Sequence, residues 1–369
     1  MKHIVLLDMD GVLIAAYGYR EATRATLRAL AEKMSQPDLL PPTDDEMLAF
    51  EAQSIIFEWD SIALMAASLF EQVPLLHAET VHDTVAAIAE AGVTLQRPDW
   101  RDFARSCPPP TPEQPSAAQI ALGRRFPATA LYTDLLATTH APEAWLTRLF
   151  QCFVLGAEQF QQTYSQPAIV QTPSLLQSHD QAVLSVAWRD ELISRADTHP
   201  VIYTARPSLP PHFAPDVTGY PPEAEIGQRL LGLHSVPLVA YGHMAWLAAE
   251  QQTATDAFVK PALMHSRLAV MRALAPDDEQ AAIDMALGLQ AIPAEWLNAP
   301  WRIIVCEDST ASIRGVQATV AALRVELEHD IVCSAVGIAE HPENVASLGT
   351  VADHVAPDVN AGLKWALGI

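Results

Sequence analysis

Two kinds of hydrophobic spacing divide the chain. Short continuous apolar runs, typical of parallel strands that are buried on both faces, occur at the N-terminus and again in the second half of the chain. They predict strands at residues 4–7, 200–204, 236–241, 302–308 and 331–339. Between the first two runs the apolar residues recur at helical spacing, which predicts helices at 19–34, 43–70, 78–91 and 142–163.

Local signals mark where some of these helices begin and end. Thr43 and Glu46 have the spacing of a capping box at the start of the second helix, and Gly92 ends the third. The segment CPPPTPEQP at 107–115 contains too much proline to continue a helix. We expect this segment to form a stiff surface connection.

The order of these elements predicts a fold with two domains. Strands that alternate with helices favour an α/β fold, a doubly wound parallel sheet with right-handed crossovers. A single N-terminal strand cannot form a sheet alone, so residues 1–14 are expected to join residues 180–369 in one core domain. Residues 15–179 then form an inserted α-helical domain. Because the insertion follows the first strand directly, we expect it to cover the strand ends as a lid.

The charge composition limits the classes of molecule that the chain could bind. The chain has 369 residues, half of them hydrophobic, and 22 basic against 44 acidic side chains give a net charge of −22. Such a balance argues against binding to nucleic acid or to anionic membranes. It would also repel anionic substrates, so a phosphate site would need local positive charge or a metal ion.

The cysteines and the longest apolar segment indicate the compartment. Cys107, Cys152, Cys306 and Cys333 lie far apart and lack CxxC spacing, which argues against a zinc site and a disulfide framework. The longest apolar stretch, near 62–70, is too short to span a bilayer. We therefore expect a soluble protein of the reducing cytoplasm.

The first strand ends in a pair of carboxylates. In IVLLDMDG, Asp8 and Asp10 follow a buried apolar run, and Gly11 comes directly after them. Open α/β sheets bind their ligands beyond the carboxyl ends of the strands, so both acids are well placed for chemistry. An Asp-rich turn after a strand is the alternative reading of this stretch alone.

Two further strand-end or helix-start residues have matching chemistry. Thr204 ends VIYT, and its hydroxyl and the neighbouring amides could bind phosphoryl oxygens, although a plain turn residue would look the same. Lys260 is one of only four lysines and stands before Pro261 at the expected start of a helix. A lysine there opposes the helix dipole unless an anion or carboxylate lies beside it.

A second carboxylate pair ends the strand at 302–308. Glu307 and Asp308 follow a branched apolar run, and Ser309 and Thr310 are suited to cap the next helix. Acids near a helix N-terminus can simply stabilise its dipole. Clusters rich in oxygen ligands also suit Mg²⁺, which keeps several water ligands and bridges to substrate phosphate.

Together, DMDGV, the threonine of VIYT, the Lys260–Pro261 pair and EDSTASI resemble the haloacid dehalogenase-like (HAD) hydrolase superfamily in residue type, order and strand-end placement. The resemblance covers residues 1–14 and about 190–369, and the insertion is similar only in being a helical cap after the first motif. One departure is Ser312, which stands where similar EDSxxGI segments carry glycine.

The resemblance implies a Mg²⁺-dependent phosphatase. Asp8 would be the nucleophile that becomes an aspartyl-phosphate, and Asp10 the general acid and base. Thr204 and Lys260 would hold the phosphoryl group, and Arg206, two residues after Thr204, could reach substrate. The metal would be bound by Asp8, the Asp10 backbone carbonyl and Asp308. Glu307 would orient metal-bound water from the second layer of side chains.

Other functions stay open at this point. In this family the second aspartate separates phosphate-handling members from dehalogenases, so Asp10 favours phosphoryl transfer. A mutase similar to β-phosphoglucomutase would use the same residues, and a non-catalytic binding protein on the same fold is the other alternative. The substrate is expected to be a small phosphorylated metabolite. Cap residues such as Arg20, Glu58 and Trp59 are candidates for its recognition, and oligomeric state is not predicted.

Overall fold

The chain folds into two compact units. The computed structural model describes residues 1–53, 55, 57–108, 116–126, 129–138, 143–215 and 217–368. One unit contains residues Met1–Ala16 and Asp180–Ile369, and the other contains Tyr17–His179. The first predicted boundary, after residue 14, lies two residues before the first junction. The predicted proline-rich connection at 107–115 falls largely outside the described residues.

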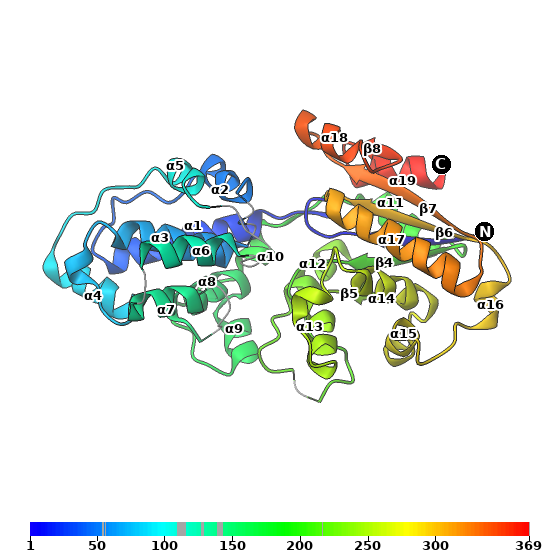
Figure 1. Cartoon of the computed structure of the whole chain (residues 1–369), viewed down its shortest axis with the longest axis horizontal. Helices are drawn as coiled ribbons and strands as arrows, with labels where there is room; N and C mark the ends of the chain where they lie inside the picture. The colour runs from blue at the N-terminus through cyan, green and yellow to red at the C-terminus, as the bar shows by residue number, and fades with distance from the viewer. Residues whose placement is uncertain are drawn as a thin grey trace. The chain divides into compact units, whose positions relative to one another are not determined.

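The first unit, here called the core unit, is built on a six-stranded sheet with the order β5-β4-β1-β6-β7-β8 and parallel pairing throughout (Figure 1). The fold is therefore α/β with a Rossmann-like sheet and a helical insertion. Its strands are β1 (Lys2–Leu7), β4 (Thr198–Tyr203), β5 (Leu238–Val239), β6 (Trp301–Glu307), β7 (Ile331–Ile338) and β8 (His354–Ala356). A second, two-stranded sheet pairs β2 (Ile14–Ala15) with β3 (Gln181–Ala182) antiparallel.

Both faces of the sheet are covered, which explains the continuous apolar runs. Along β1, Ile4 and Leu6 pack into one buried cluster, and Val5 and Leu7 pack into the other. Successive side chains of a strand point to opposite faces, so a strand between two helical layers needs apolar residues at every position. All four side chains are fully buried.

The helices of the core unit form two layers (Figure 1). One face of the sheet packs against α13 (Tyr241–Glu250), α14 (Leu263–Leu274), α15 (Glu279–Ala286), α17 (Thr310–Leu327) and α18 (Pro342–Leu348). The other face packs against α11 (Val186–Ser194), α12 (Glu223–Leu231) and α19 (Val359–Leu367). The short α16 (Ala294–Leu297) and the 3-10 turn η2 (Thr255–Ala257) lie in connections.

Crossover connections change face between β1 and β6. Chain segments that lead from β1 through β4 to β5 use α11 and α12, whereas those from β6 through β7 to β8 use α17 and α18. β1 and β6 are neighbours in the sheet. Their carboxyl ends therefore form the topological switch point, where open α/β sheets bind ligands.

The second unit, here called the helical unit, consists of helices and their connections, with no strand among its described residues, in agreement with the expected α-helical insertion. Its elements are α1 (Tyr17–Lys33), α2 (Asp44–Glu51), α3 (Glu58–Phe70), η1 (Pro74–Leu76), α4 (Val81–Ala91), α5 (Trp100–Arg105), α6 (Ala117–Arg125), α7 (Ala130–Ala137), α8 (Trp145–Leu155), α9 (Ala157–Tyr164) and α10 (Leu175–His179). The apolar side chains of α3 and α8 are almost entirely buried in it.

Several predicted boundaries in the helical unit need correction. The capping box at Thr43 and Glu46 is present, but the predicted helix 43–70 is two helices, α2 and α3. The predicted helix 142–163 is likewise split into α8 and α9 at Gly156, which has φ +82°. A side chain at that φ is strained, so glycine permits the break. α4 ends just before Gly92, as predicted, and this glycine has the left-handed conformation.

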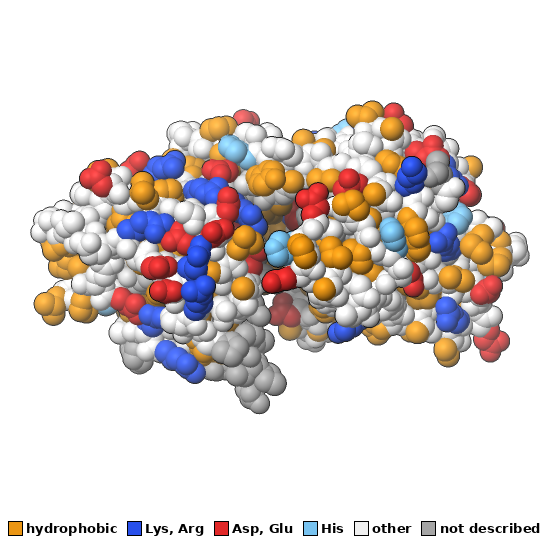
Figure 2. All heavy atoms as spheres, turned by 90° about the horizontal axis from the view of Figure 1, so that it is seen from above, with side chains coloured by type: hydrophobic (Ala, Val, Ile, Leu, Met, Phe, Trp, Pro, Cys, Tyr) orange, Lys and Arg blue, Asp and Glu red, His pale blue; other side chains and the backbone are white. Residues whose placement is uncertain are grey.

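Charged side chains of both signs are interspersed on one face of the helical unit (Figure 2). Arg24 pairs with Asp44, and Arg97 makes a two-point contact with Glu46, with one N–O distance of 2.6 Å. Burial raises the pKa of Glu46, but the hydrogen bonds from Arg97 and Thr43 outweigh burial and lower it.

The helices of both units are too short or too polar for a membrane span: among the described residues, none could cross a bilayer.

Candidate active site

Strand register brings the candidate acids to one level. Leu7 lies opposite Cys306 of β6, so the next residues, Asp8 and Glu307, stand side by side. The Asp8 backbone N–H donates to the Cys306 carbonyl at 3.1 Å and keeps this register. Tyr203, the last residue of β4, comes from the other side of β1. These residues lie at the switch point between β1 and β6.

Lys260 forms two buried ion pairs at this edge. Its Nζ lies 2.5 Å from Asp8 Oδ1 and 2.7 Å from Glu307 Oε1. Only 10% of the Lys260 side chain is exposed, against 7% for Asp8 and none for Glu307. The lysine therefore stands beside carboxylates. The helix, however, begins at Leu263, three residues later than expected.

The two buried carboxylates that share Lys260 have pKa values shifted in opposite directions. Burial and the charge of Glu307 raise the pKa of Asp8 well above its usual range. Burial acts the same way on Glu307, but the charge and hydrogen bond of Lys260 outweigh it and lower that pKa. Burial lowers the pKa of Lys260, and Asp8 and Glu307 more than reverse this. The single lysine therefore favours the ionised form of Glu307 over that of Asp8.

Asp308 adds a third carboxylate on the open side of the group. One carboxylate oxygen each from Asp8, Glu307 and Asp308 lie within 4.8 Å of one another. Asp308 is solvent-exposed, yet burial by surrounding protein and the charge of Glu307 raise its pKa to about 7. An all-oxygen donor set with net negative charge fits Mg²⁺.

Gly11 lets Asp308 approach the turn that follows β1. This glycine has φ +75°, and a Cβ atom at this position would collide with the Asp308 carboxylate. Both the backbone conformation and the lack of space exclude a side chain. The sequence DMDG and the second carboxylate pair are therefore matched to each other.

Asp10 lies outside the carboxylate group. Its Oδ2 accepts from Arg206 Nε at 3.1 Å, and its Oδ1 pairs with the second terminal nitrogen of Arg206. Arg206 Nη1 donates to Asp180 Oδ2 at 3.0 Å. None of the Arg206 side chain is exposed, so this geometry does not support the predicted substrate contact. Arg206 instead fixes the Asp10 carboxylate, 36% of which is exposed.

Thr204 is buried immediately after β4. Its backbone N–H donates to the Val239 carbonyl at 3.0 Å, and its hydroxyl accepts from the Arg206 N–H at 3.1 Å. The hydroxyl thus fixes the turn that presents Arg206 to Asp10. Of the predicted residues, Asp8, Lys260, Glu307 and Asp308 are in one group, and Thr204, Arg206 and Asp10 form an adjoining chain of contacts.

Some contributing residues gave no usable sequence signal. Tyr203 donates its hydroxyl to Glu307 Oε1 at 3.3 Å, and Lys260 Nζ lies 4.8 Å from the centre of the Tyr203 ring. Glu307 Oε2 also accepts the Asp308 backbone N–H at 3.0 Å. Asp180 stands at the start of the second core segment, in a stretch without a motif. A buried tyrosine in a strand reads as ordinary core, and a lone aspartate reads as a turn.

His265 holds the backbone of Lys260. Its Nδ1 accepts the Lys260 N–H at 3.0 Å, so the ring proton is on Nε2, which donates to the Val239 carbonyl at 3.3 Å. Behind this segment, the Pro261 carbonyl approaches Gly315 so closely that a Cβ atom there would clash. Burial and the charge of Lys260 lower the pKa of His265 to about 3.

This buried neutral imidazole predicts a pH dependence of stability. Below the ordinary histidine pKa of 6.5, the unfolded chain binds a proton that the folded chain refuses, so stability falls as the pH drops from about 6.5 toward 3. His265→Gln keeps an acceptor and a donor but does not titrate. We expect its free-energy difference from wild type to shrink by about 1 kcal/mol per pH unit between pH 6 and 4. Urea unfolding at several pH values measures this, and a constant difference would contradict it.

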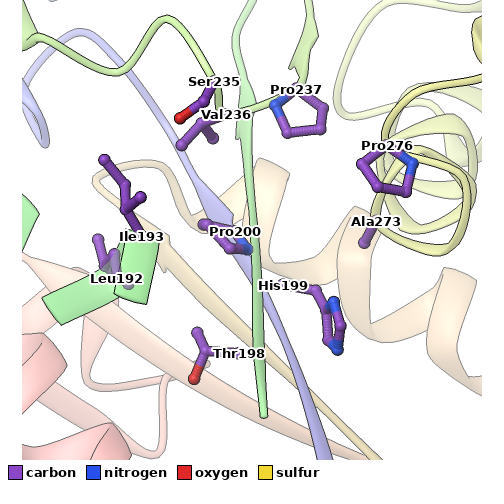
Figure 3. A pocket seen from close by; sticks show the side chains of 10 residues that line it. All are labelled: Leu192, Ile193, Thr198, His199, Pro200, Ser235, Val236, Pro237, Ala273 and Pro276. Carbon is purple, nitrogen blue, oxygen red and sulfur yellow. The ribbon is translucent and has the colours of Figure 1, made fainter. Parts of the chain in front are cut away.

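A cavity of about 270 Å³ lies elsewhere in the core unit (Figure 3). It is lined by Thr198, His199 and Pro200 at the start of β4, together with residues of the α11, β5 and α14 regions. Thr204 follows the opposite end of the same strand, and a six-residue strand spans roughly 20 Å. The cavity is therefore remote from the carboxylate group and is mostly apolar.

Comparisons with known proteins bear on the fold. No family model and no curated protein matches the chain. An X-ray structure of a Northeast Structural Genomics Consortium target has a TM-score of 0.65 at 12% identity, covering 100% of this chain and 98% of the other. Phosphatase Tt82 from Thermococcus thioreducens has a TM-score of 0.49 at 15% identity, covering 99% of both chains. The first likeness shows a shared fold alone, and the second is too low to carry an argument.

Proposed function

We propose that this chain is a Mg²⁺-dependent phosphatase of the haloacid dehalogenase-like type that hydrolyses a small phosphate monoester through a phosphorylated Asp8. The observation that carries the proposal is the 2.5 Å contact between Lys260 Nζ and Asp8 Oδ1 at the switch point of the sheet. Lys260 works against the burial and the Glu307 charge that raise the pKa of Asp8, and it also attracts a phosphoryl group. Four sequence motifs from separate parts of the chain supply this edge.

In the first half of the reaction, an Asp8 carboxylate oxygen attacks phosphorus and the bond to the leaving oxygen breaks. Asp10 gives its proton to that oxygen, which departs as an alcohol. Lys260 offsets the charge on the transferring group. The product of this half is an aspartyl-phosphate on Asp8.

In the second half, Asp10 takes a proton from water as the water oxygen attacks the same phosphorus. The bond between phosphorus and the Asp8 oxygen breaks, which releases inorganic phosphate and restores the carboxylate. Asp10 needs access to the leaving group and to water, and its partly exposed side chain meets that need. Each Asp10 oxygen that accepts from Arg206 keeps a second lone pair for the proton, so the contact with Arg206 can persist during proton transfer.

Asp8 and Asp308 would hold Mg²⁺, together with the Asp10 backbone carbonyl. When bound, the ion would neutralise charge on the phosphoryl oxygens and on the acids themselves. Glu307 is committed to Lys260, Tyr203 and backbone N–H groups, so it is better suited to hold the group in place. The bound ion would also supply the local positive charge that an anionic substrate needs in a chain of net charge −22.

Release of inorganic phosphate tests the proposal directly. Purified protein with Mg²⁺ is expected to hydrolyse p-nitrophenyl phosphate and, faster, some member of a panel of phosphorylated sugars, nucleotides and small acids. Free phosphate is measured after each incubation. Folded protein that releases none from any compound would reject a phosphatase, and isomerised product with the phosphate retained would indicate a mutase instead.

A further inference from the structure

The Arg206 side chain joins two carboxylates that are 170 residues apart in the chain, Asp10 and Asp180. The guanidinium presents Nε and one terminal nitrogen to both oxygens of Asp10. Its other terminal nitrogen donates to Asp180 at 3.0 Å. Arg206 is fully buried and Asp180 is 1% exposed, whereas Asp10 keeps 36% of its side chain exposed. Asp10 is thus the only member of these three that faces solvent appreciably.

Because Arg206 and Asp180 are buried, the three side chains are restricted to one relative orientation. A buried guanidinium is stable only with its donors satisfied and its charge balanced. Its planar fork accepts a carboxylate edge-on in one orientation, so the plane of Arg206 determines the plane of Asp10. Asp180 occupies the opposite nitrogen and thereby fixes the rotation of that plane. Gly227 of α12 lies close behind this nitrogen, because a Cβ atom there would come within 3.2 Å of Arg206 Nη1.

The position of Asp180 in the chain gives this contact its meaning. Asp180 is the first residue of the core unit after the helical insertion. The next two residues form β3, which pairs with β2, and β2 begins four residues after Asp10. The segment that returns from the insertion is therefore tied to the turn that carries Asp10, once by strand pairing and once through Arg206.

We propose that Asp180 and Arg206 are positioning residues for Asp10, and that they orient its carboxylate for proton transfer to the leaving group. This inference rests on the proposed phosphatase function and deepens it. Neither residue touches the phosphoryl group. Arg206 holds both oxygens of Asp10, and Asp180 holds Arg206, so loss of either lets the acid adopt unproductive orientations.

Substrates that differ in leaving group separate positioning from a general structural role. The leaving oxygen of an alkyl phosphate must be protonated, whereas the 2,4-dinitrophenolate group of 2,4-dinitrophenyl phosphate can depart without a proton. kcat/KM reports the steps up to formation of the aspartyl-phosphate, so it excludes the later hydrolysis. Since general acid catalysis contributes about 10²–10⁴-fold, we expect Arg206→Lys to lower kcat/KM about 30-fold or more for the alkyl ester and less than about 5-fold for the dinitrophenyl ester.

Asp180→Asn keeps the size of the side chain and removes its charge, and it should give the same selective loss at about 10-fold. The matched control is Arg267→Lys, because Arg267 also forms a two-point pair, with Glu326, in the core unit. We expect this control variant to have the same kcat/KM as wild type for both substrates. Circular dichroism and thermal melting establish that each variant is folded.

Equal losses on both substrates, or no loss on either, in a folded Arg206→Lys or Asp180→Asn variant would overturn the positioning role while leaving the phosphatase assignment intact. Lack of turnover of both substrates by wild type would instead overturn the proposed function and this inference with it. The two failures are therefore distinguishable.

Discussion

Asp8→Asn is expected to abolish phosphatase activity, with a loss of about 10⁴-fold or more in kcat, and to leave the fold intact. The amide cannot attack phosphorus, so no aspartyl-phosphate forms. The substitution should not cost stability, because burial and the charge of Glu307 already raise the pKa of Asp8. A raised pKa means that the folded state disfavours the charged carboxylate, and a neutral side chain of the same shape relieves this.

Turnover of p-nitrophenyl phosphate and thermal melting measure the two parts of this prediction. The melting temperature of Asp8→Asn should equal or exceed that of wild type. Asp190→Asn, which removes an exposed aspartate of α11 paired with Arg189, is the matched control and should keep full activity. Residual turnover above about 1% of wild type in Asp8→Asn would reject a covalent role for this residue.

Removal of divalent cations is expected to reduce turnover at least 10³-fold, and added Mg²⁺ should restore it. Asp8, Glu307 and Asp308 face a single lysine, so the described group has a formal excess of two negative charges. A divalent ion balances that excess, and its binding should also stabilise the folded state. Mg²⁺ titrations followed by both turnover and melting temperature measure these effects.

Asp308→Asn separates the metal site from a general effect of salt. This variant should need a higher Mg²⁺ concentration for both the activity and the rise in melting temperature. NaCl at matched ionic strength should produce neither effect. Activity that survives thorough treatment with EDTA would contradict the metal assignment, even if Asp8 proves essential.

The sheet was largely predictable because burial on both faces makes strands easy to recognise. β1 and β6 appear as continuous apolar runs that end in acids, and parallel strands bring their carboxyl ends to one edge. The three-residue edge strand β8 was missed, since His354 interrupts its apolar character and it pairs on one side only. The strand expected at 236–241 is reduced to Leu238–Val239.

For the candidate site, the sequence predicted which residues come together but not all of their contacts. Asp8, Glu307 and Asp308 stand at the ends of two neighbouring strands, so sheet topology alone predicts that they meet. Lys260 lies in a turn three residues before α14, so its place in the group was predicted from the motif resemblance and not from topology. The contacts of Arg206 were not predictable. Its partner Asp180 lies in a stretch without a motif, and only three-dimensional packing shows that the guanidinium is enclosed rather than directed outward. Topology predicts which residues converge, whereas packing decides which way a long side chain points.

The central place of β1 has a consequence for how the chain folds. β1 is made well before its neighbour β4, which begins at Thr198, after the whole insertion. Within the helical unit, α1 packs against α10, so this unit brings its own two ends together when it folds. That shortens the loop between β1 and β4 about sevenfold, or by nearly three doublings of length, which lowers the entropic cost of closing it by roughly 1.7 kcal/mol. Early folding of the insertion would therefore help the N-terminal strand to find its place in the middle of the sheet.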